Sequence, residues 1–569
     1  MTNTLNIKHC LLLLASIVLF NNYILAQKNN KIVYKVSYQQ FSNGKYQENR
    51  DFDMVYSNGI CYLSNDDDKI RHYIDLTKKL NVDIITYNDS LYKTLSHFDN
   101  LPTPISISDS VEIINKHKCK KAVYSSFSNT IEVWYNDEFE AKGSPYANFL
   151  PDYNSLVMKV EINGNRSIVF DKIQKIKIDE LLAYPFENAI EITDSEFEEL
   201  KILSRYIIVP VFDDERVNFN PELPKLNIDD TLNDQIYHLS NGGVILKKIK
   251  LPEITKKGAS CFAKLNVKSD GDAYDRTGSI FVIQNENQNL ILDAFNNSLD
   301  VLPVIQDKNG EEYQGIIKTT DYDPPIELMR FFTSFGAGNF NILRPINNYN
   351  WAKDILYKQE ITNLIPDDTD EIWIGVFIGN YDKNGHKVSL ELDFYPGWED
   401  EIDSLSKFIM PLFNTVNIME MSGQNYCKLF KTDTLQVEFN LPEHLTNPQL
   451  IFTTTGHGGW GNGDEFVSKL NQVLIDGNKV FEILPWRTDC ATYRLSNPAS
   501  GNFGNGLSSS DLSRSNWCPG TLTPPYFIPL TEIEPGKHNI QIIIDQGEDE
   551  GSSFNHWSVS GTIVGKIKK

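Results

Sequence analysis

The residues of this sequence that could perform chemistry are acids lying next to arginines in turn-rich segments. The first such place is residues 269–276, where Asp272-Ala-Tyr-Asp-Arg276 leads into a strand-like run at 278–284. An Asp at the edge of a strand has its pKa and its orientation set by a neighbouring Arg, as a water-activating base requires. Asp275 is therefore a candidate base. The alternative is an Asp-rich turn without function, which residue type alone favours.

A glycine-rich run at residues 453–465 is the second place. Five of its thirteen residues are glycine, and it carries His457, Trp460, Asp464 and Glu465. Glycine lets a backbone approach a ligand closely, and an indole ring offers a flat face to a sugar. The run indicates a ligand-binding loop. The alternative for its acids is ordinary solvation, which is the more frequent role of an acid in a loop.

A long segment at residues 486–520 is the third place, and it contains Arg514 and Trp517. About thirty residues without strand periodicity would be flexible unless they were cross-linked. A disulfide between Cys490 and Cys518 can close this segment, at a typical gain of about 2–4 kcal/mol. Such a cross-link would hold Arg514 and Trp517 in place.

Signatures of several enzyme classes are missing from the sequence. It has no His-Glu-x-x-His, Gly-x-Ser-x-Gly, Gly-x-x-x-x-Gly-Lys-Ser/Thr or Cys-x-x-Cys, and its ten histidines include no His-x-His pair. A metal site would need an unusual set of ligands. We expect neither a metal nor a cofactor.

The chain begins with a segment typical of export. Lys8 precedes an apolar core at residues 11–25 and the small residue Ala26, so residues 1–26 are predicted to be a cleaved signal peptide. We expect a secreted or periplasmic protein without membrane insertion, because no later run of about 18 apolar residues follows. Removing Cys10 leaves six cysteines, which allow fifteen disulfide connectivities.

The rest of the chain is predicted to be all-β. We expect an N-terminal β-rich domain at 27–210, a linker at 211–234, and two β-sandwiches at 235–404 and 405–569. Residues 321–351, rich in Pro and Asn, are expected to form a long functional loop. Strands and one helix are predicted at residues 31–38, 131–135, 155–162, 194–201 (the helix), 243–249, 260–267, 278–284, 372–378, 388–395, 435–439, 449–454, 470–475, 538–544 and 559–567.

The net charge and the aromatic content limit the classes of molecule that this protein could bind. The net charge of -23 argues against nucleic acid and anionic lipid, which require a basic surface, and suggests a neutral substrate. Aromatic residues make up 11% of the chain, which suits sugar recognition and equally suits an all-β core. A monomer is expected, although nothing in the sequence fixes the oligomeric state.

Taken in order, these segments resemble the bacterial peptide-N-glycosidase F family of asparagine amidases. The resemblance spans about residues 235–567 and rests on Asp272-Ala-Tyr-Asp-Arg276, Met329-Arg-Phe-Phe-Thr333, residues 456–465 and Arg514-Ser-Asn-Trp-Cys-Pro-Gly520. It implies two adjacent eight-stranded jelly rolls with an active site in a cleft at their interface. The N-terminal domain looks like the bowl-shaped domain of the longer members.

The resemblance also implies functional residues. It places the essential catalytic acid on Asp275, its companion on Arg276, and the acid of the second jelly roll on Glu465. The remaining family positions fall on Arg514 near the catalytic centre, on Trp517 in the cleft, and on a Cys490–Cys518 disulfide.

One position departs from the family. A further family Glu falls on Gly379, and Tyr381 replaces the aromatic residue two positions later. Either Asn380 or Asp382 takes over its role, or the contact is missing.

The sequence as a whole predicts an exported amidase that releases N-glycans from glycoproteins or glycopeptides and converts Asn to Asp. Asp275 would activate water, Arg514 would stabilise charge, and Glu465 would bind the proximal sugar or relay a proton. The predicted substrate-binding residues are Arg276, Asp272, Trp460, Trp517, Tyr381 and His457. Two alternatives are a non-catalytic glycan-capture protein on the same scaffold and a copper monooxygenase with a related jelly-roll pair, against which the missing His-x-His pair counts.

Overall fold

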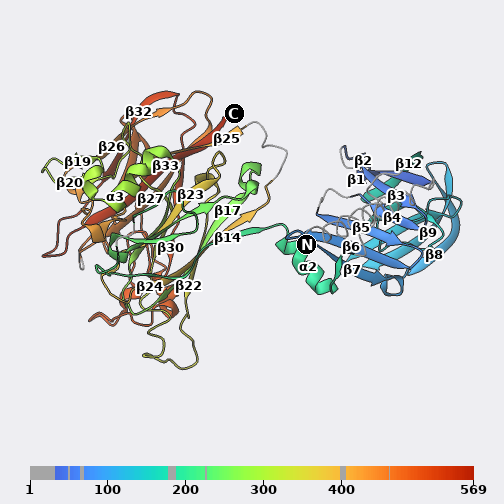
Figure 1. Cartoon of the computed structure of the whole chain (residues 1–569), viewed down its shortest axis with the longest axis horizontal. Coiled ribbons are helices and arrows are strands. Elements are labelled where there is room, and N and C mark those ends of the chain that lie inside the picture. The colour runs from blue at the N-terminus through green and yellow to red at the C-terminus, as the bar shows by residue number, and fades with distance from the viewer. Residues whose placement is uncertain are drawn as a thin grey trace, which may run out of the picture. The chain divides into compact units, whose positions relative to one another are not determined.

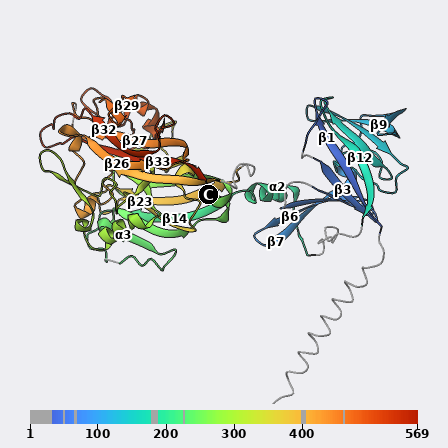
Figure 2. The ribbon, with the colours of Figure 1, turned by 90° about the horizontal axis from the view of Figure 1, so that it is seen from above.

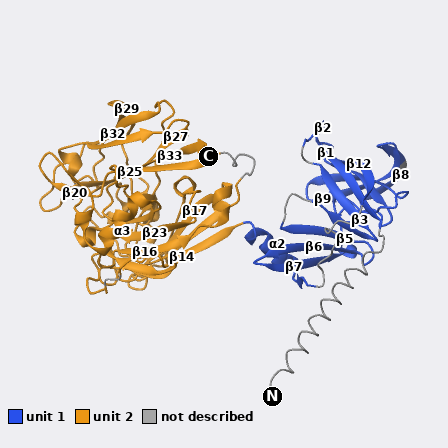
Figure 3. Cartoon of the chain, turned by 45° about the horizontal axis from the view of Figure 1, so that its top comes forward, with its two compact units in different colours: residues 1–205 blue, residues 206–569 orange. Residues whose placement is uncertain are grey.

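The computed structural model in Figure 1 describes residues 32–48, 51–64, 69–176, 188–224, 227–397, 405–459 and 462–568. The predicted signal peptide and Trp460 therefore lie outside the described residues. The chain divides into two compact units, Met1–Arg205 and Tyr206–Lys569 (Figure 3). In the described part of the chain, no helix has both the length and the apolar character needed to cross a membrane.

Unit 1 is built on one sheet with thirteen strands among the described residues, in the order β13-β7-β6-β5-β4-β3-β1-β12-β11-β10-β9-β8 with β2 beside β1. Most neighbours in the sheet are also neighbours in sequence, because tight turns join them. Two-residue turns at 43–44, 58–59 and 163–164 read Asn-Gly with positive φ at both residues, which matches the twist of a hairpin. The strands are β1 (Val33–Ser42), β2 (Lys45–Tyr46), β3 (Phe52–Ser57), β4 (Ile60–Leu63), β5 (Ile70–Asp75), β6 (Leu80–Tyr87), β7 (Ser90–His97), β8 (Ser106–Ile114), β9 (His117–Ser126), β10 (Asn129–Asn136), β11 (Leu156–Ile162), β12 (Arg166–Ile176) and β13 (Ile190–Glu191).

Helix α2 (Asp194–Leu203) ends unit 1 and confirms the predicted helix. Thr193 and Glu196 form a capping box, in which each side chain bonds the other residue's backbone N–H. The helix buries Phe197 against Ile70 and Ile85 of the sheet.

The predicted linker at 211–234 is wrong at its start. Residues 207–217 form strand β14 (Ile207–Val217), which pairs with β24 (His386–Tyr395) of unit 2. The polar run 213–216 suggested a linker because β14 is the edge strand of its sheet, where charged side chains and an irregular register are common. The unit boundary lies at 205/206, before the predicted one.

The first β-sandwich of unit 2 packs a four-stranded sheet (β14-β24-β17-β22) on a six-stranded sheet (β15-β16-β23-β18-β21-β30). Leu265 and Leu390 from one sheet and Ile280 and Val376 from the other meet in its core. Helix α3 (Asn289–Asn296) covers the outer face of the larger sheet. The further strands are β15 (Ile236–Leu239), β16 (Val244–Lys250), β17 (Ser260–Ser269), β18 (Thr277–Ile283), β21 (Ile326–Phe332), β22 (Ile355–Glu360), β23 (Glu371–Ile378) and β30 (Leu522–Thr523), with a small hairpin of β19 (Val304–Gln306) and β20 (Glu312–Gln314).

The second β-sandwich packs the sheet β25-β33-β27-β31 on the sheet β26-β32-β28-β29. Figure 2 shows β26, β27 and β32 of this sandwich above β14 and β23 of the first. Leu450, Val473 and Ile542 belong to its core. The predicted all-β pair of sandwiches is confirmed. The strands are β25 (Leu405–Asn414), β26 (Leu435–Leu441), β27 (Thr446–His457), β28 (Asn471–Ile475), β29 (Asn478–Ile483), β31 (Tyr526–Pro529), β32 (Gly536–Ile544) and β33 (His556–Lys568).

Strand β21 joins the two sandwiches and corrects the predicted loop at 321–351. All seven of its residues are buried, so its sequence shows no alternation that would indicate a strand. It pairs with β30 from the last quarter of the chain. The buried guanidinium of Arg330 pairs with Glu327 at 2.6 Å and donates to Thr455 Oγ1 of β27 at 3.1 Å.

Candidate active site

Asp275 lies in the turn between β17 and β18, and Thr333 holds the backbone on both sides of it. The Thr333 hydroxyl accepts a hydrogen bond from the Arg276 N–H at 2.7 Å and donates one to the Tyr274 carbonyl at 3.0 Å. The Thr333 N–H donates to the Arg276 carbonyl at 2.9 Å. Thr333 directly follows β21, so the strand that joins the sandwiches also fixes the position of Asp275.

Asp272 is buried and orients Arg276. Its carboxylate accepts hydrogen bonds from Arg276 Nε at 2.8 Å and from the Tyr274 N–H at 2.9 Å. The Asp272 side chain has no exposed surface, so its contacts in this structure are with Arg276 and the turn, and its substrate-binding role stays a prediction. Arg276 keeps 21% of its side-chain surface exposed and lies near the rings of Tyr274 and Tyr381.

Glu465 is presented by the glycine-rich run, which begins later than predicted because β27 continues to His457. Gly458 has φ +90°, and a Cβ at this position would lie 1.9 Å from the Phe554 carbonyl oxygen. Here glycine is needed for close packing on residues 553–557. Asp464 anchors the run, since its buried carboxylate accepts hydrogen bonds from Trp557 Nε1 at 2.7 Å and from the Gly547 N–H at 3.0 Å.

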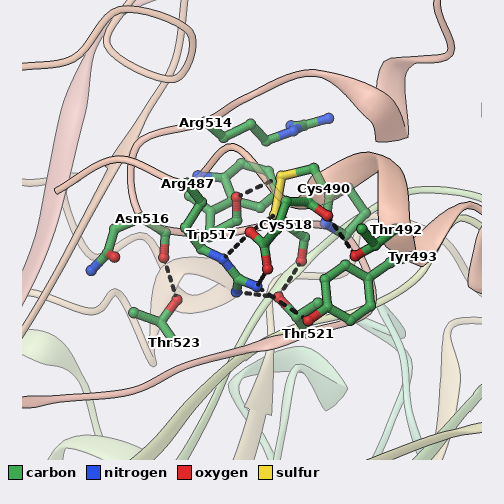
Figure 4. Close-up of a disulfide and its surroundings, with 12 residues drawn as sticks. Arg487, Cys490, Thr492, Tyr493, Arg514, Asn516, Trp517, Cys518, Thr521 and Thr523 are labelled. Carbon is green, nitrogen blue, oxygen red and sulfur yellow. Dashed lines mark hydrogen bonds and ion pairs between the residues drawn. A yellow bond between two sulfur atoms is a disulfide. The ribbon is translucent and has the colours of Figure 1, made fainter.

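Arg514 comes from the long segment that the disulfide closes. Cys490 and Cys518 are bonded, which confirms the predicted pairing, and Figure 4 shows the bond among Arg487, Trp517 and Thr521. Two backbone hydrogen bonds, of 2.9 and 3.1 Å, join residue 487 to residue 514.

The four other described cysteines are buried free thiols: Cys61, Cys119, Cys261 and Cys427.

The structure brings Asp275, Glu465 and Arg514 together, as predicted. Arg514 Nη1 lies 3.2 Å from Asp275 Oδ2 and also pairs with Glu465 Oε1. The guanidinium is 2% exposed, whereas the Asp275 and Glu465 side chains are 16% and 19% exposed. Its Nη2 donates to the Ser509 carbonyl at 2.8 Å, and its Cζ lies 4.3 Å from the centre of the Trp517 ring. One buried cation thus holds two acids that solvent can reach.

Burial sets the electrostatics of this group. It raises the pKa of Asp275 above its ordinary value, and Arg514 and Arg276 partly offset the increase. Burial also raises the pKa of Glu465 to about 7, a rise that Arg514 opposes and Asp275 reinforces. Two carboxylates that share one guanidinium titrate as a pair. Near neutral pH such a pair can hold one proton and use the other carboxylate as a base.

Two of the predicted substrate-binding residues are buried. Trp517 is 3% exposed, stacks on Phe332 with ring centres 4.3 Å apart, and donates from Nε1 to the Gly456 carbonyl at 3.0 Å. His457 is 6% exposed, and its Nε2 lies 2.8 Å from Thr455 Oγ1. Neither ring offers a face to a sugar in this structure. Both rings instead pack beneath the surface of the site and help to hold its residues in position.

Tyr381 is exposed and connects to an acid that sequence reasoning missed. Its hydroxyl lies 2.6 Å from that of Tyr426, which donates to Glu420 Oε2 at 2.7 Å. A Cβ at Gly379 would lie 2.7 Å from Glu420 Oε1. Burial raises the pKa of Glu420 to about 7.

Glu420 therefore fills the space next to Gly379, where the family pattern places an acid. The two substitutes considered from sequence do not. Asn380 is buried and donates to the Val217 carbonyl, and Asp382 accepts from the N–H of Asn384. No local signal reveals Glu420, because it lies 41 positions after residue 379 and only the fold brings the two together.

Potential metal ligands come together at one place among the described residues, at Asp489, Cys490 and Cys518. Both sulfur atoms are used in the disulfide. Asp489 instead pairs with Arg487 at 2.6 Å.

The fold is an all-β pair of sandwiches, and two acids surround one arginine at their junction. Known protein families point to the class of protein that has this architecture. Residues 208–394 match the family described as Peptide-N-glycosidase F, N terminal, and residues 425–564 match its C-terminal counterpart. Residues 36–195 match the family described as N-glycanase peptide, N-terminal domain. The chain belongs to the peptide-N-glycosidase F family, with the extra N-terminal domain.

Two crystal forms of PNGF-II are similar to this chain at 40% identity. One covers 95% of this chain and 98% of its own with a TM-score of 0.74, and the other covers 94% and 99% with a TM-score of 0.75. No curated protein sequence matches the chain.

Proposed function

We propose that this protein is an exported amidase that hydrolyses the bond between an Asn side chain and N-acetylglucosamine in N-glycoproteins. The observation that carries the proposal is the junction of the two sandwiches, where Asp275 and Glu465 flank Arg514. Membership of the peptide-N-glycosidase F family supports the same substrate class.

Each group has a role that its surroundings allow. Asp275, when ionised, removes a proton from water, whose oxygen bonds to the amide carbon. Arg514 stabilises the charge that develops around this carbon. The C–N bond then breaks, Glu465 in its protonated form supplies the proton that the departing glycosylamine needs, and Asn becomes Asp.

We propose that Glu420 takes the role of the family Glu, whose position is occupied by Gly379 in this chain. Tyr381 presents the exposed end of the hydroxyl chain that leads through Tyr426 to this carboxylate, beside Arg276. We expect Glu420→Gln to raise KM for a glycopeptide about tenfold and to leave kcat nearly unchanged, as the loss of a charged hydrogen bond predicts. Glu443→Gln, at an exposed position, is the matched control; equal KM values in the two variants would contradict the role of Glu420.

The test of the function is the mass of a peptide after incubation with the protein. Loss of the glycan together with conversion of Asn to Asp is the expected result. A glycopeptide that binds and stays unchanged would instead identify a glycan-capture protein. We expect Asp275→Asn to abolish turnover; full activity of this variant would refute the proposed mechanism even if the substrate is right.

A further inference from the structure

A cavity in unit 1, outside the candidate active site, has the lining of a ligand site. Its volume is about 370 Å³, near the lower end of the range of about 300–1,000 Å³ typical of small-molecule pockets. Strands β5, β6 and β7 form one wall, and helix α2 and residues 146–149 form the other.

The sheet wall is polar although it is covered. His72, Asp83 and Thr94 lie side by side across the three strands, and Asn81 pairs with Ser96 in the next row. The neighbouring positions on the other face of the sheet, among them Tyr73 and Val82, form an apolar core. Asn81 and Thr94 are each only 6% exposed, because α2 and the loop cover this wall. A wall buried to this extent would normally carry apolar side chains, since burying a polar group without a partner is costly.

The polar groups of this wall are incompletely paired. Asn81 Oδ1 is buried and accepts no hydrogen bond from the described residues. The Asn81 amide reaches Asn148 Oδ1 at 3.5 Å, at the limit of a hydrogen bond. Leaving a buried polar group without a partner destabilises a fold, so this arrangement favours a ligand that supplies the missing partners.

The charge and shape of the lining limit what the ligand can be. Asp83, Asp194 and Glu198 line the cavity, and the described lining residues include no Lys or Arg. Each acid already has a partner: His72 Nδ1 lies 2.5 Å from Asp83, Thr94 donates to Asp194, and Lys201 bonds Glu198 at 2.8 Å. The remaining oxygens of these acids can accept hydrogen bonds from hydroxyl groups. The negative charge of the acids would repel an anion.

Aromatic rings complete the lining. Tyr146 and Phe149 lie with ring centres 6.3 Å apart, and Tyr146 is partly exposed. Aliphatic C–H faces of sugars pack on such rings while their hydroxyls take the polar wall.

We infer that this cavity binds a neutral sugar, such as the terminal residue of a glycan. The volume suits one or two sugar rings, the acceptors suit hydroxyl groups, and the carboxylates exclude sialylated or phosphorylated sugars. The inference does not depend on amidase activity, because the cavity is formed by unit 1 alone.

The experiment is saturation-transfer difference NMR on the full chain with mannose, N-acetylglucosamine, galactose and fucose, each at millimolar concentration. Sialic acid and spermidine serve as anionic and cationic counter-probes. We expect a signal from at least one neutral sugar. Asp83→Asn should weaken its binding about tenfold or more, as loss of a charged hydrogen-bond acceptor predicts. The control Asp99→Ala, at an exposed acid elsewhere in unit 1, should leave binding unchanged.

Glu465→Gln separates this cavity from the candidate active site, because it should keep the signal that Asp83→Asn weakens. Asn148→Ala, in the loop wall, provides the same test if Asp83→Asn does not fold. The inference is overturned if none of the four sugars binds, if a counter-probe binds in their place, or if the signal depends on Glu465 and not on Asp83. None of these results would bear on the glycopeptide assay.

Discussion

Replacing Arg514 with Gln tests the centre of the proposed mechanism. This residue is the only one described whose cation contacts both Asp275 and Glu465, and it is 2% exposed. The neutral amide removes the charge that the two carboxylates share.

The size of the effect follows from these contacts. Removing one preorganised group that stabilises the charge of a transition state raises the activation free energy by about 2.7–4 kcal/mol. Because Asp275 and Glu465 keep 16% and 19% of their side-chain surfaces exposed, water partly replaces the lost partner and the lower end applies. About 3 kcal/mol corresponds to a decrease of about 100-fold in kcat/KM.

The pH dependence gives a second, independent readout. Arg514 lowers the pKa of both acids, so its loss must raise them further. A base with a raised pKa is less ionised at any given pH, and the acid limb of the kcat/KM profile should therefore move to higher pH. Arg514→Lys keeps the charge and should move this limb less than Arg514→Gln does.

The assay follows the release of glycan from one N-glycopeptide by mass spectrometry across a range of pH, with thermal unfolding to verify that each variant is folded. The exposed Arg344, which donates to the Ser500 carbonyl of the same long segment, provides the control variant Arg344→Gln. A folded Arg514→Gln variant with wild-type kcat/KM and an unmoved acid limb would refute the reasoning.

Three further predictions concern the parts that hold the site. Thr333→Val removes both side-chain hydrogen bonds to the turn before β18, so we expect kcat to fall about tenfold and the free energy of unfolding to fall by about 1–3 kcal/mol. Thr333→Ser should restore both, and equal kcat values in the two variants would count against this role. Arg330→Ala leaves Glu327 unpaired between the sandwiches and should lower the free energy of unfolding by about 3–5 kcal/mol, measured with urea, an expectation that an unchanged transition midpoint would contradict. Replacing both Cys490 and Cys518 with Ser should cost about 2–4 kcal/mol of stability and lower activity, whereas wild-type behaviour in both assays would show that the cross-link is dispensable.

Much of the fold could be read from local pattern. Strands such as β24 and β32 were predicted because alternating apolar residues mark a strand with one buried face. Helix α2 was predicted because its start is marked locally, by a capping residue followed by acids in the first turn. Strand β21 was missed because both of its faces are buried, and β14 because an edge strand tolerates charge.

In the candidate site, too, the sequence predicted what depends on local segments and missed what depends on packing. Asp275, Glu465 and Arg514 were predicted because each stands in a short segment that resembles its counterpart in a known family. The sequence could not show that Asp272, His457 and Trp517 are buried, since burial depends on what the chain folds over them.

The sequence by itself therefore determined the all-β class, the disulfide and the three residues at the centre of the site. Only the tertiary structure decided which neighbours support these residues and which reach solvent. The clearest case is Glu420, which fills the space beside Gly379 although the two are far apart in the chain. The same holds for the polar cavity of unit 1, whose walls come from three strands, a loop and a helix. Local sequence encodes periodicity and turns, whereas contacts between distant segments arise only when the sheets pack.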